Sequence, residues 1–440
     1  MFQAQRTIVE DSELPCVVAV RDGRVAAIEP IGSRMDARER VELGDDVVLL
    51  PGLVDTHVHV NEPGRTEWEG FDTATRAAAA GGVTTIIDMP LNSVPPTTTL
   101  AGLVAKQDRA RSQAHVDVGF WGGAVPGNLA DLAELDAAGV FGFKCFLIDS
   151  GVPEFPPLDA AGFAAAMSET ARLGALLIVH AEDAEVIEHA PPAAGRRYST
   201  FLHSRPPTAE IRAIARVLSV ARTTGARAHI LHLSSADALT ELRAARAAGA
   251  DVSVESCPHY LALDADTIPD GATQFKCCPP IRARENQDRL WRGLADGDID
   301  MIVSDHSPCT LELKRLESGD FGQAWGGIAS VQLGLAVMWT AARARGHALA
   351  DVVRWMATAP ADRVGLPRKG RIAVGADADL CVFAPDESFV VDPERLLHKN
   401  PVSAYAGLQL TGAVRQTWLR GARVDPHGEP HGRLLRRGQP

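Results

Sequence analysis

Eight short apolar runs separated by helical patterns constrain the fold of this chain more than any other feature. The stretches between most of them are Ala-rich or amphipathic, as in 69–80, 208–222 and 235–248, and end near glycine. This alternation, over about 320 residues, predicts an α/β fold of the (β/α)₈ TIM-barrel type. A doubly wound open sheet is the alternative, but no Gly-x-Gly-x-x-Gly motif follows a run to provide its usual nucleotide site. The runs are residues 54–59, 83–89, 116–120, 142–148, 176–180, 228–233, 252–256 and 301–304.

Both ends of the chain show short strand patterns bounded by turn residues. Near the start, Asp22-Gly23 separates two apolar runs, which is typical of a β-hairpin. Near the end, 379–383 and 413–418 are further strand candidates. We therefore predict a small β-sandwich domain built from both termini, residues 1–50 with 371–440, around a barrel of residues 51–370. The Gly-, Pro- and Arg-rich tail from residue 426 to 440 is expected to be loose.

Composition narrows the classes of function. The 440 residues include 44 Lys and Arg against 56 Asp and Glu, a net charge of -12. Such an acidic chain lacks the electrostatic footprint of a nucleic-acid or membrane-surface binder. The sequence has no membrane-spanning apolar run and no signal-peptide pattern. Seven cysteines are few and odd in number, which favours a reducing, cytoplasmic location over a disulfide framework.

Candidate metal ligands stand where strands end. His57 and His59 are two residues apart on the first strand, so their imidazoles point to the same side and can chelate one metal. His180, His232 and Asp305 end three other strands. Each alone is more typical of a hydrogen-bonded core residue. Together they share the carboxyl-terminal rim of the barrel, where active sites of this fold lie. We therefore predict a metal site at this rim.

One lysine interrupts the apolar fourth strand. The chain has only six lysines, and Lys144 lies among buried-type residues, where an ammonium group is costly and its pKa falls. One interpretation pairs Lys144 with a buried carboxylate such as Asp88. The other is that the neutral amine reacts with CO₂ to give a carbamate, an anionic ligand that bridges two metals. The three histidine-bearing strands around Lys144 favour the carbamate.

The predicted ligand set fits two divalent metals. Imidazole and oxygen donors suit zinc, with manganese, cobalt or iron as alternatives. Asp305 can both ligate a metal and accept a proton from the attacking water, so it is the candidate general base and then general acid. The set is His57, His59, Lys144, His180, His232 and Asp305.

Several motifs resemble the cyclic amidohydrolases, the family of allantoinases, dihydroorotases and hydantoinases with dihydropyrimidinases. The resemblance runs from residue 22 to 418 and matches all six ligand positions. Five segments are most similar to the allantoinases: 59–70, 89–93, 255–260, 304–309 and 324–328. The resemblance implies a barrel with a β-sandwich, two zinc ions, a carboxylated lysine, a homotetramer, and hydrolysis of the ring amide of allantoin to allantoate in purine breakdown.

Departures from the other branches bear on the substrate. Dihydroorotases typically carry an Arg two residues after His-x-His to hold a substrate carboxylate, where this chain has Asn61. Hydantoinases usually have a Tyr five residues after the lysine, where this chain has Asp149. Much of the family has a Ser before Pro-Pro, where this chain has Cys278. The Asn61 amide suits neutral allantoin. The carboxylate of a substrate such as dihydroorotate would find no cationic partner at position 61.

The resemblance also implies substrate contacts and leaves alternatives open. Asn61, Asn92 and Ser307 are candidates to hydrogen-bond the ring and the ureido arm, and loop capping is the other reading of Asn92 and Ser307. Backbone groups of Cys278, Gly326 and Gly327 are further candidates. His259 and His306 adjoin the site. Hydantoinase, dihydropyrimidinase or dihydroorotase activity is the main alternative function, and a non-catalytic family member is a less favoured one because no ligand position is lost.

Overall fold

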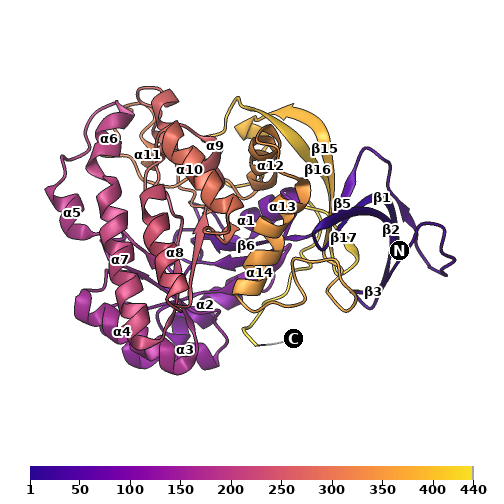
Figure 1. Ribbon diagram of the computed structural model, residues 1–440, viewed down its shortest axis with the longest axis horizontal. Coiled ribbons are helices and arrows are strands. Elements are labelled where there is room, and N and C mark those ends of the chain that lie inside the picture. The colour runs from indigo at the N-terminus through magenta and orange to yellow at the C-terminus, as the bar shows by residue number, and fades with distance from the viewer. Residues whose placement is uncertain (439–440) are drawn as a thin grey trace.

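The computed structural model describes residues 1–438 and contains a (β/α)₈ barrel beside a β-sheet (Figure 1). Each barrel strand overlaps one of the eight predicted runs, so the predicted fold class is confirmed. The strands are buried throughout, apart from Arg227 at the start of the sixth, as expected for a parallel sheet covered on both faces. They are β6 (Leu53–Val58), β7 (Val83–Asp88), β8 (Asp117–Phe120), β10 (Phe143–Phe146), β11 (Leu176–His180), β12 (Arg227–Ile230), β13 (Val252–Ser256) and β14 (Met301–Ile302).

Hydrogen bonds between two groups of strands complete the ring. Strands β6 to β8 pair in parallel as one group, and the two-residue β9 (Gly122–Gly123) starts a second group that runs through β10 to β14. The Phe141 N–H donates to the Phe120 carbonyl at 2.9 Å between the groups. On the other side, the His59 N–H donates to the His306 carbonyl at 2.8 Å. This second bond brings His59 and Asp305 to the same part of the rim.

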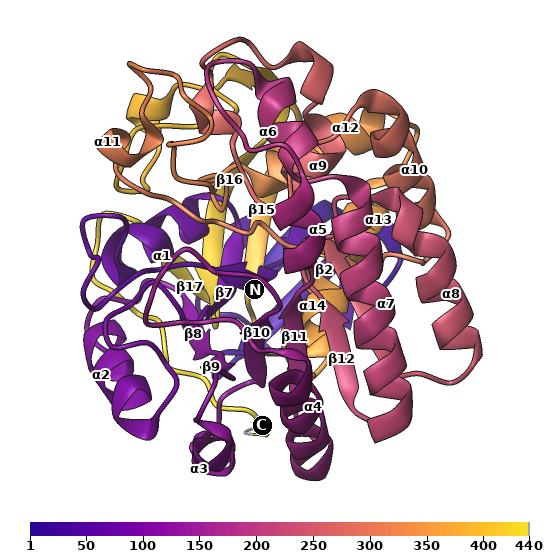
Figure 2. The same ribbon diagram turned by 90° about the vertical axis from the view of Figure 1, so that its left-hand side faces the viewer.

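The helices begin and end at the signals expected from the sequence. Gly225 ends α7 (Pro207–Thr224) in the left-handed conformation, with φ 69°. The Ser235 hydroxyl accepts from the Asp237 N–H at the start of the turn leading into α8 (Leu239–Ala247). Helices α4 (Ala160–Leu173), α7 and α8 lie outside the strands (Figure 2). The other α-helices are α1 (Phe71–Ala80), α2 (Leu100–Ala110), α3 (Leu132–Ala137), α5 (Ala184–His189), α6 (Tyr198–Ser204), α9 (Pro258–Ala262), α10 (Arg284–Ala295), α11 (Leu311–Lys314), α12 (Gly334–Ala344), α13 (Leu349–Val353) and α14 (Ala359–Arg363).

The two ends of the chain meet in one eight-stranded sheet. Val48 lies opposite Phe383 in an antiparallel pair, so the last part of the chain is hydrogen-bonded to the first. The Phe2 and Trp418 rings pack edge to face at 4.8 Å in the core beneath this sheet. The strands are β1 (Phe2–Val9), β2 (Ser12–Arg21), β3 (Arg24–Glu29), β4 (Val41–Glu42), β5 (Val48–Pro51), β15 (Leu380–Val390), β16 (Gln409–Leu419) and β17 (Ala422–Val424).

The tail after residue 426 is not loose over its docked part, so that prediction is wrong for residues 432–437. The Val118 N–H of β8 donates to Arg433 at 2.9 Å, and the Leu435 N–H donates back to Val118 at 2.8 Å. The Asp117 carboxylate also accepts the Arg433 N–H at 2.8 Å. The edge of β8 therefore supplies backbone partners that the tail composition does not reveal. Residues 439 and 440 lie outside the described residues.

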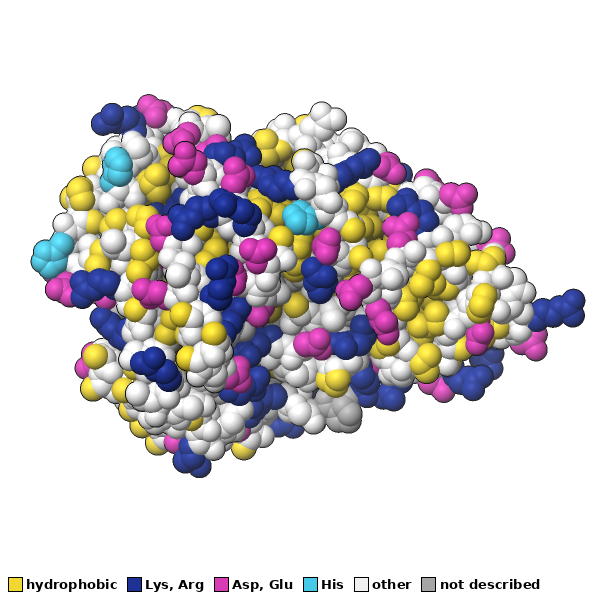
Figure 3. Space-filling view, in the orientation of Figure 1, with side chains coloured by type: hydrophobic (Ala, Val, Ile, Leu, Met, Phe, Trp, Pro, Cys, Tyr) yellow, Lys and Arg dark blue, Asp and Glu magenta, His cyan; other side chains and the backbone are white. Residues whose placement is uncertain are grey.

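A buried ionic cluster joins the barrel to the sheet. The Lys369 ammonium lies 2.6 Å from Asp117 of β8, 2.6 Å from Asp379 and 3.0 Å from Asp377. Arg420, in the turn between β16 and β17, also binds Asp117, at 2.6 Å. Outside this cluster, acidic and basic side chains are interspersed over the face in Figure 3. None of the helices formed by residues 1–438 is both long and apolar enough to cross a membrane.

Candidate metal centre and active site

The structure brings the six predicted ligands to one end of the barrel. His57 lies on β6 and His59 just beyond it, Lys144 lies on β10, and His180 ends β11. His232 and Asp305 follow β12 and β14 in short loops. All six are buried, with at most 6% of any residue exposed. The shared rim follows from parallel strands, whose carboxyl ends meet at one edge.

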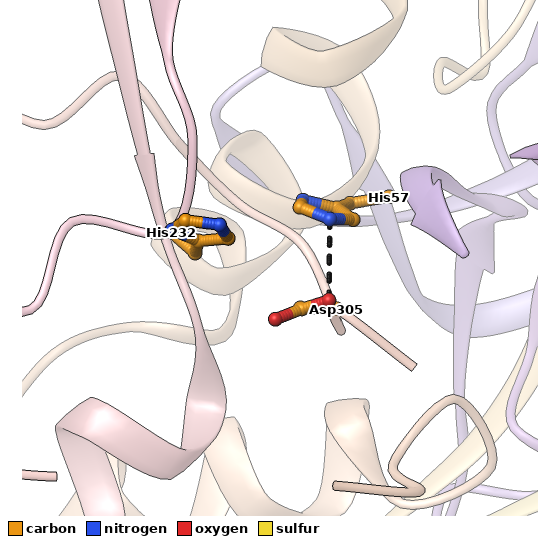
Figure 4. Close-up of side chains that lie close together, drawn as sticks. All are labelled: His57, His232 and Asp305. Carbon is orange, nitrogen blue, oxygen red and sulfur yellow. Dashed lines mark ion pairs between the residues drawn. The ribbon is translucent and has the colours of Figure 1, made fainter. Parts of the chain in front are cut away.

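Asp305 lies between three of the imidazoles. Its Oδ1 is 3.2 Å from Nε2 of His57 and 3.5 Å from Nε2 of His59. Ligand atoms of His57, His232 and Asp305 all lie within 4.8 Å of one another (Figure 4). Burial raises the pKa of Asp305, but the adjacent imidazoles outweigh burial and hold the pKa well below its usual range. This direction favours the carboxylate form of Asp305, which both ligation and base catalysis require.

The histidine nitrogens fit a bound cation. Burial lowers the pKa of His57, His59 and His232, the second to about 4, and so favours the neutral form of each ring, which keeps a lone pair for a metal. Within residues 1–438, Nε2 of His57 and Nδ1 of His232 are buried without a hydrogen-bond partner. Nδ1 of His180 lies 3.0 Å from Nε2 of His232. Two buried ring nitrogens without a protein partner, close to a third imidazole and a carboxylate, suit a metal site.

Two glutamates that the sequence analysis did not assign orient the histidines. Glu255 of β13 lies 2.5 Å from Nδ1 of His57 and 3.0 Å from Nε2 of His229. Glu182 lies 2.8 Å from Nε2 of His180. Such carboxylates fix the tautomer of a ring. In His57 this leaves Nε2 without a hydrogen-bond partner, whereas Nδ1 of His180 faces His232. The sequence offered a signal for each glutamate. Glu255 lies in a segment that resembles the family, and Glu182 follows the candidate ligand His180 by two residues.

Lys144 has the environment expected for a reactive amine. The residue is 1% exposed, and burial lowers the pKa of its ammonium to about 8, with Asp305 and Glu255 opposing that change. Its Nζ makes no ion pair or hydrogen bond within residues 1–438 and lies 5.0 Å from the centre of the Phe146 ring. Asp88 instead pairs with Lys106 at 2.7 Å, so the Asp88 pairing considered for Lys144 does not occur. This arrangement supports the carbamate interpretation.

A cavity of about 450 Å³ opens onto the six ligands. Of the predicted substrate contacts, Asn92, Cys278, Ser307, Gly326 and Gly327 line it. The exposed Asp149 carboxylate also lies on its wall. Gly327 donates its N–H to the Lys276 carbonyl at 2.8 Å, so this amide is already engaged.

Asn61 lies behind the cavity wall. It is fully buried, and its Oδ1 accepts a hydrogen bond from Asn92 Nδ2 at 3.1 Å. Asn61 can therefore orient Asn92, which itself lies on the wall beside His59. His259 and His306 also lie outside the wall. His306 is held by Glu69, at 3.1 Å, while His259 lies near Asp305 and is fully buried.

Two cations on the wall correct the expectation that a substrate carboxylate would find no cationic group. Arg205 and Lys276 both line the cavity. These side chains reach the cavity from the loop after α6 and from residues 276–278, far in sequence from position 61, so the motif around His57 and His59 does not reveal them. Arg205 forms an ion pair with the buried Glu182. Lys276 donates to the Ala324 carbonyl at 2.6 Å and lies 5.2 Å from the centre of the Phe201 ring.

Comparisons with known proteins agree with the fold and the site. The model of the amidohydrolase family matches residues 48–424, so the chain belongs to that family. Three curated relatives are named allantoinases. That of Streptomyces avermitilis is 57% identical over 99% of this chain and 98% of its own. Those of Saccharomyces cerevisiae and Arabidopsis thaliana are 46% and 42% identical, over 94% and 97% of this chain and 90% and 88% of their own.

Solved structures with the same fold carry a different enzyme name. The L-hydantoinase (dihydropyrimidinase) from Arthrobacter aurescens superposes with a TM-score of 0.92 and is 31% identical, with 99% of each chain covered. A D-hydantoinase superposes with a TM-score of 0.89 at 26% identity, over 99% of this chain and 98% of its own. The family and fold are thus shared across both names, and the sequence similarity is higher to the allantoinases.

Proposed function

We propose that this protein hydrolyses the ring amide of allantoin to allantoate, a step of purine breakdown. The observation that carries the proposal is the 57% identity to an allantoinase along 99% of the chain, together with the six candidate ligand side chains that line one cavity at the barrel rim. A non-catalytic role is disfavoured, because such a protein would not need to keep six buried ligand positions at one rim.

Two divalent metals, zinc or else manganese, cobalt or iron, are proposed as the cofactors. Carboxylated Lys144 would bridge them: the neutral amine forms an N–C bond to CO₂ and releases a proton to solvent, leaving an anionic carbamate. When bound, the metals would polarise the scissile carbonyl and activate water. The other ligands would be His57, His59, His180, His232 and Asp305.

The side chains of this protein would then move the proton and hold the rings in place. Asp305 accepts a proton from the attacking water and returns it to the ring nitrogen as the amide C–N bond breaks. Glu255 and Glu182 keep the imidazoles of His57 and His180 oriented, so that the site does not have to reorganise during the reaction. Because all these groups are buried, water can reach them only through the cavity.

Substrate contacts are proposed at the cavity wall. Asn92 and Ser307 would hydrogen-bond the substrate through their side chains, and Cys278 and Gly326 would do so through backbone groups. Asn61 would act by orienting Asn92. Gly327 would contribute its position on the wall, because its own N–H is occupied by Lys276.

Hydantoinase or dihydropyrimidinase activity is the second candidate, favoured by the TM-score of 0.92 to such an enzyme, and dihydroorotase activity is the third. The test is a comparison of kcat/KM for allantoin, hydantoin, dihydrouracil and dihydroorotate with metal-loaded protein. We expect the highest value for allantoin. A higher value for any other ring would replace the proposed substrate while leaving the family assignment in place.

We also propose a cytoplasmic homo-oligomer, a tetramer by analogy with the family. All seven cysteines are free thiols, which suits a reducing compartment. Residues 51–370 are proposed as the hydrolase barrel, and 1–50 with 371–440 as the β-sandwich domain. Light scattering of the purified protein would measure the oligomeric state directly.

A further inference from the structure

Arg205 presents unused hydrogen-bond donors to the active-site cavity. It follows α6, lines the cavity, and its side chain is 19% exposed. One nitrogen, Nη1, donates to Glu182. Within residues 1–438, Nε and Nη2 make no hydrogen bond and are not among the buried unpartnered atoms. The planar guanidinium therefore offers two further donor nitrogens, Nε and Nη2, where a substrate could reach them.

Glu182 sets both the position and the net charge of this donor. A single oxygen, Oε2, accepts from Arg205 and lies 2.8 Å from Nε2 of His180. The guanidinium and His180, a proposed metal ligand, thus share one carboxylate oxygen of Glu182. Glu182 is fully buried, so its negative charge offsets the positive charge of Arg205 at close range. The pair presents donors with little net charge, which suits a neutral acceptor better than a carboxylate.

Lys276, the other cation on the wall, is less suited to this role. Its ammonium is held by the Ala324 carbonyl at 2.6 Å and by the face of Phe201. It has no carboxylate partner within residues 1–438, so it would attract an anion rather than select a neutral group. Of the two cations, Arg205 is therefore the one whose charge is offset and whose hydrogen-bond donors can select a neutral group.

We propose that Arg205 binds the carbonyl oxygen of the ureido arm of the substrate and selects rings that carry such an arm. This inference rests on the proposed function. A urea carbonyl is a neutral, strong acceptor, and allantoin differs from hydantoin by this arm. The Glu182–Arg205 pair would align the arm next to the His180 ligand without attracting charged rings.

The test compares allantoin with hydantoin, which lacks the ureido arm, in two matched variants. Removal of Arg205 alone would leave Glu182 as an unpaired buried charge, so Arg205→Met is combined with Glu182→Gln, whose amide oxygen still accepts from His180. Glu182→Gln alone, which keeps Arg205, is the reference. We expect the double variant to lose about 10–100-fold in kcat/KM for allantoin relative to that reference, mostly through KM.

Hydantoin, which has the same ring without the arm, is the control ligand. It is measured as a substrate and as a competitive inhibitor, so that its Ki reports ring binding even if turnover is slow. We expect both constants to stay close to those of the Glu182→Gln reference, with equal metal content in the two proteins. An equal loss for both ligands would overturn the inference, because Arg205 would then act only through Glu182 and His180.

Two further results separate the possible failures. Lys276→Met should change kcat/KM for allantoin and for hydantoin by a similar factor. A selective loss for allantoin in that variant, but not in the Arg205 variant, would also overturn the inference. If wild-type protein with bound metal hydrolyses hydantoin but not allantoin, the proposed function fails, and the inference fails with it. If wild-type protein hydrolyses allantoin and the variant loss is not selective, only the inference fails.

Discussion

Lys144 is the residue whose chemistry depends most on its surroundings. Its amine is buried, has no ion-pair partner within the described residues, and lies among the proposed ligands. Lys144→Ala should therefore lose most bound metal and activity, because the bridging anion is gone. Acetate or propionate at high concentration should restore part of both by replacing the carbamate oxygens. Metal content and allantoin turnover are the measurements, and two metals with a near-normal rate in the untreated variant would contradict the carbamate.

The pKa of Lys144 gives a second prediction, for metal-free protein in CO₂-free buffer. Burial lowers this pKa from 10.5 to about 8. Between these values the unfolded chain holds a proton that the folded chain lacks, so the free energy of unfolding rises with pH across this window. The destabilisation caused by burying a protonated Lys144 is fully present below pH 8. From pH 7 to 10, wild type should gain on the order of 2–3 kcal/mol relative to Lys144→Met in urea unfolding. Parallel pH profiles would show that Lys144 is not buried as an amine.

Asp305 is the residue proposed to move the proton. Asp305→Asn keeps the size of the side chain but cannot accept a proton, so kcat should fall by roughly 10²–10⁴-fold. Circular dichroism should show an intact fold, since one rim residue is exchanged for a near-isostere. Because Asp305 is also a proposed ligand, metal content is measured alongside the rate. Activity within a few-fold of wild type at full metal loading would place the proton transfer elsewhere.

Candidate ligands at strand ends could be predicted from the sequence better than the residues that hold those candidates in place. The predicted ligands stand at strand ends, and alternation of side chains along a strand is a local rule. The contact of Arg205 with Glu182, next to His180, joins residues that are 23 positions apart in the sequence. It depends on how the loop after α6 folds back toward the end of β11, which no local rule predicts. Asn61 was expected to touch substrate, yet its left-handed backbone, with φ 65°, and its bond from Asn92 place it behind the wall.

At the scale of elements, the strands could be predicted because each barrel strand is a continuous apolar run bounded by turns. The register and closure could not, because they depend on pairings between distant segments, such as His59 with His306. The docked tail was missed for the same reason. Its composition is typical of a loose segment, while its partners lie on β8, more than 300 residues earlier in the chain.

Removal of the tail tests this docking. A chain that ends at Val424 loses the backbone bonds of Gly432, Arg433 and Leu435 to residues 114–118, each worth about 0.5–1.5 kcal/mol. We expect the Tm to fall by several degrees while kcat stays near that of the full chain, because these contacts lie at the opposite end of β8 from the rim. A chain that ends at Arg437 keeps them and is the control. Equal Tm values for both truncations would show that the tail does not contribute to stability.

At the scale of the whole molecule, the fold and the substrate are separate questions. An L-hydantoinase shares the complete architecture, with a TM-score of 0.92, whereas relatives with 57% and 40% identity are named allantoinase and probable allantoinase. The barrel supplies a rim on which the candidate metal ligands converge, and the loops around the cavity supply the proposed substrate contacts. The assignment of the substrate therefore depends on the cavity wall and on sequence similarity rather than on the fold.

The most direct test of the account is a metal titration of chelator-stripped protein, with allantoate formation as the measured rate. We predict almost no turnover without metal, then a rise that reaches a plateau at about two zinc ions per protomer in bicarbonate-containing buffer, the number that a bridged two-metal site would hold. Full allantoin hydrolysis by stripped protein, or no hydrolysis at saturating metal, would contradict the central claim of a metal-dependent allantoin hydrolase.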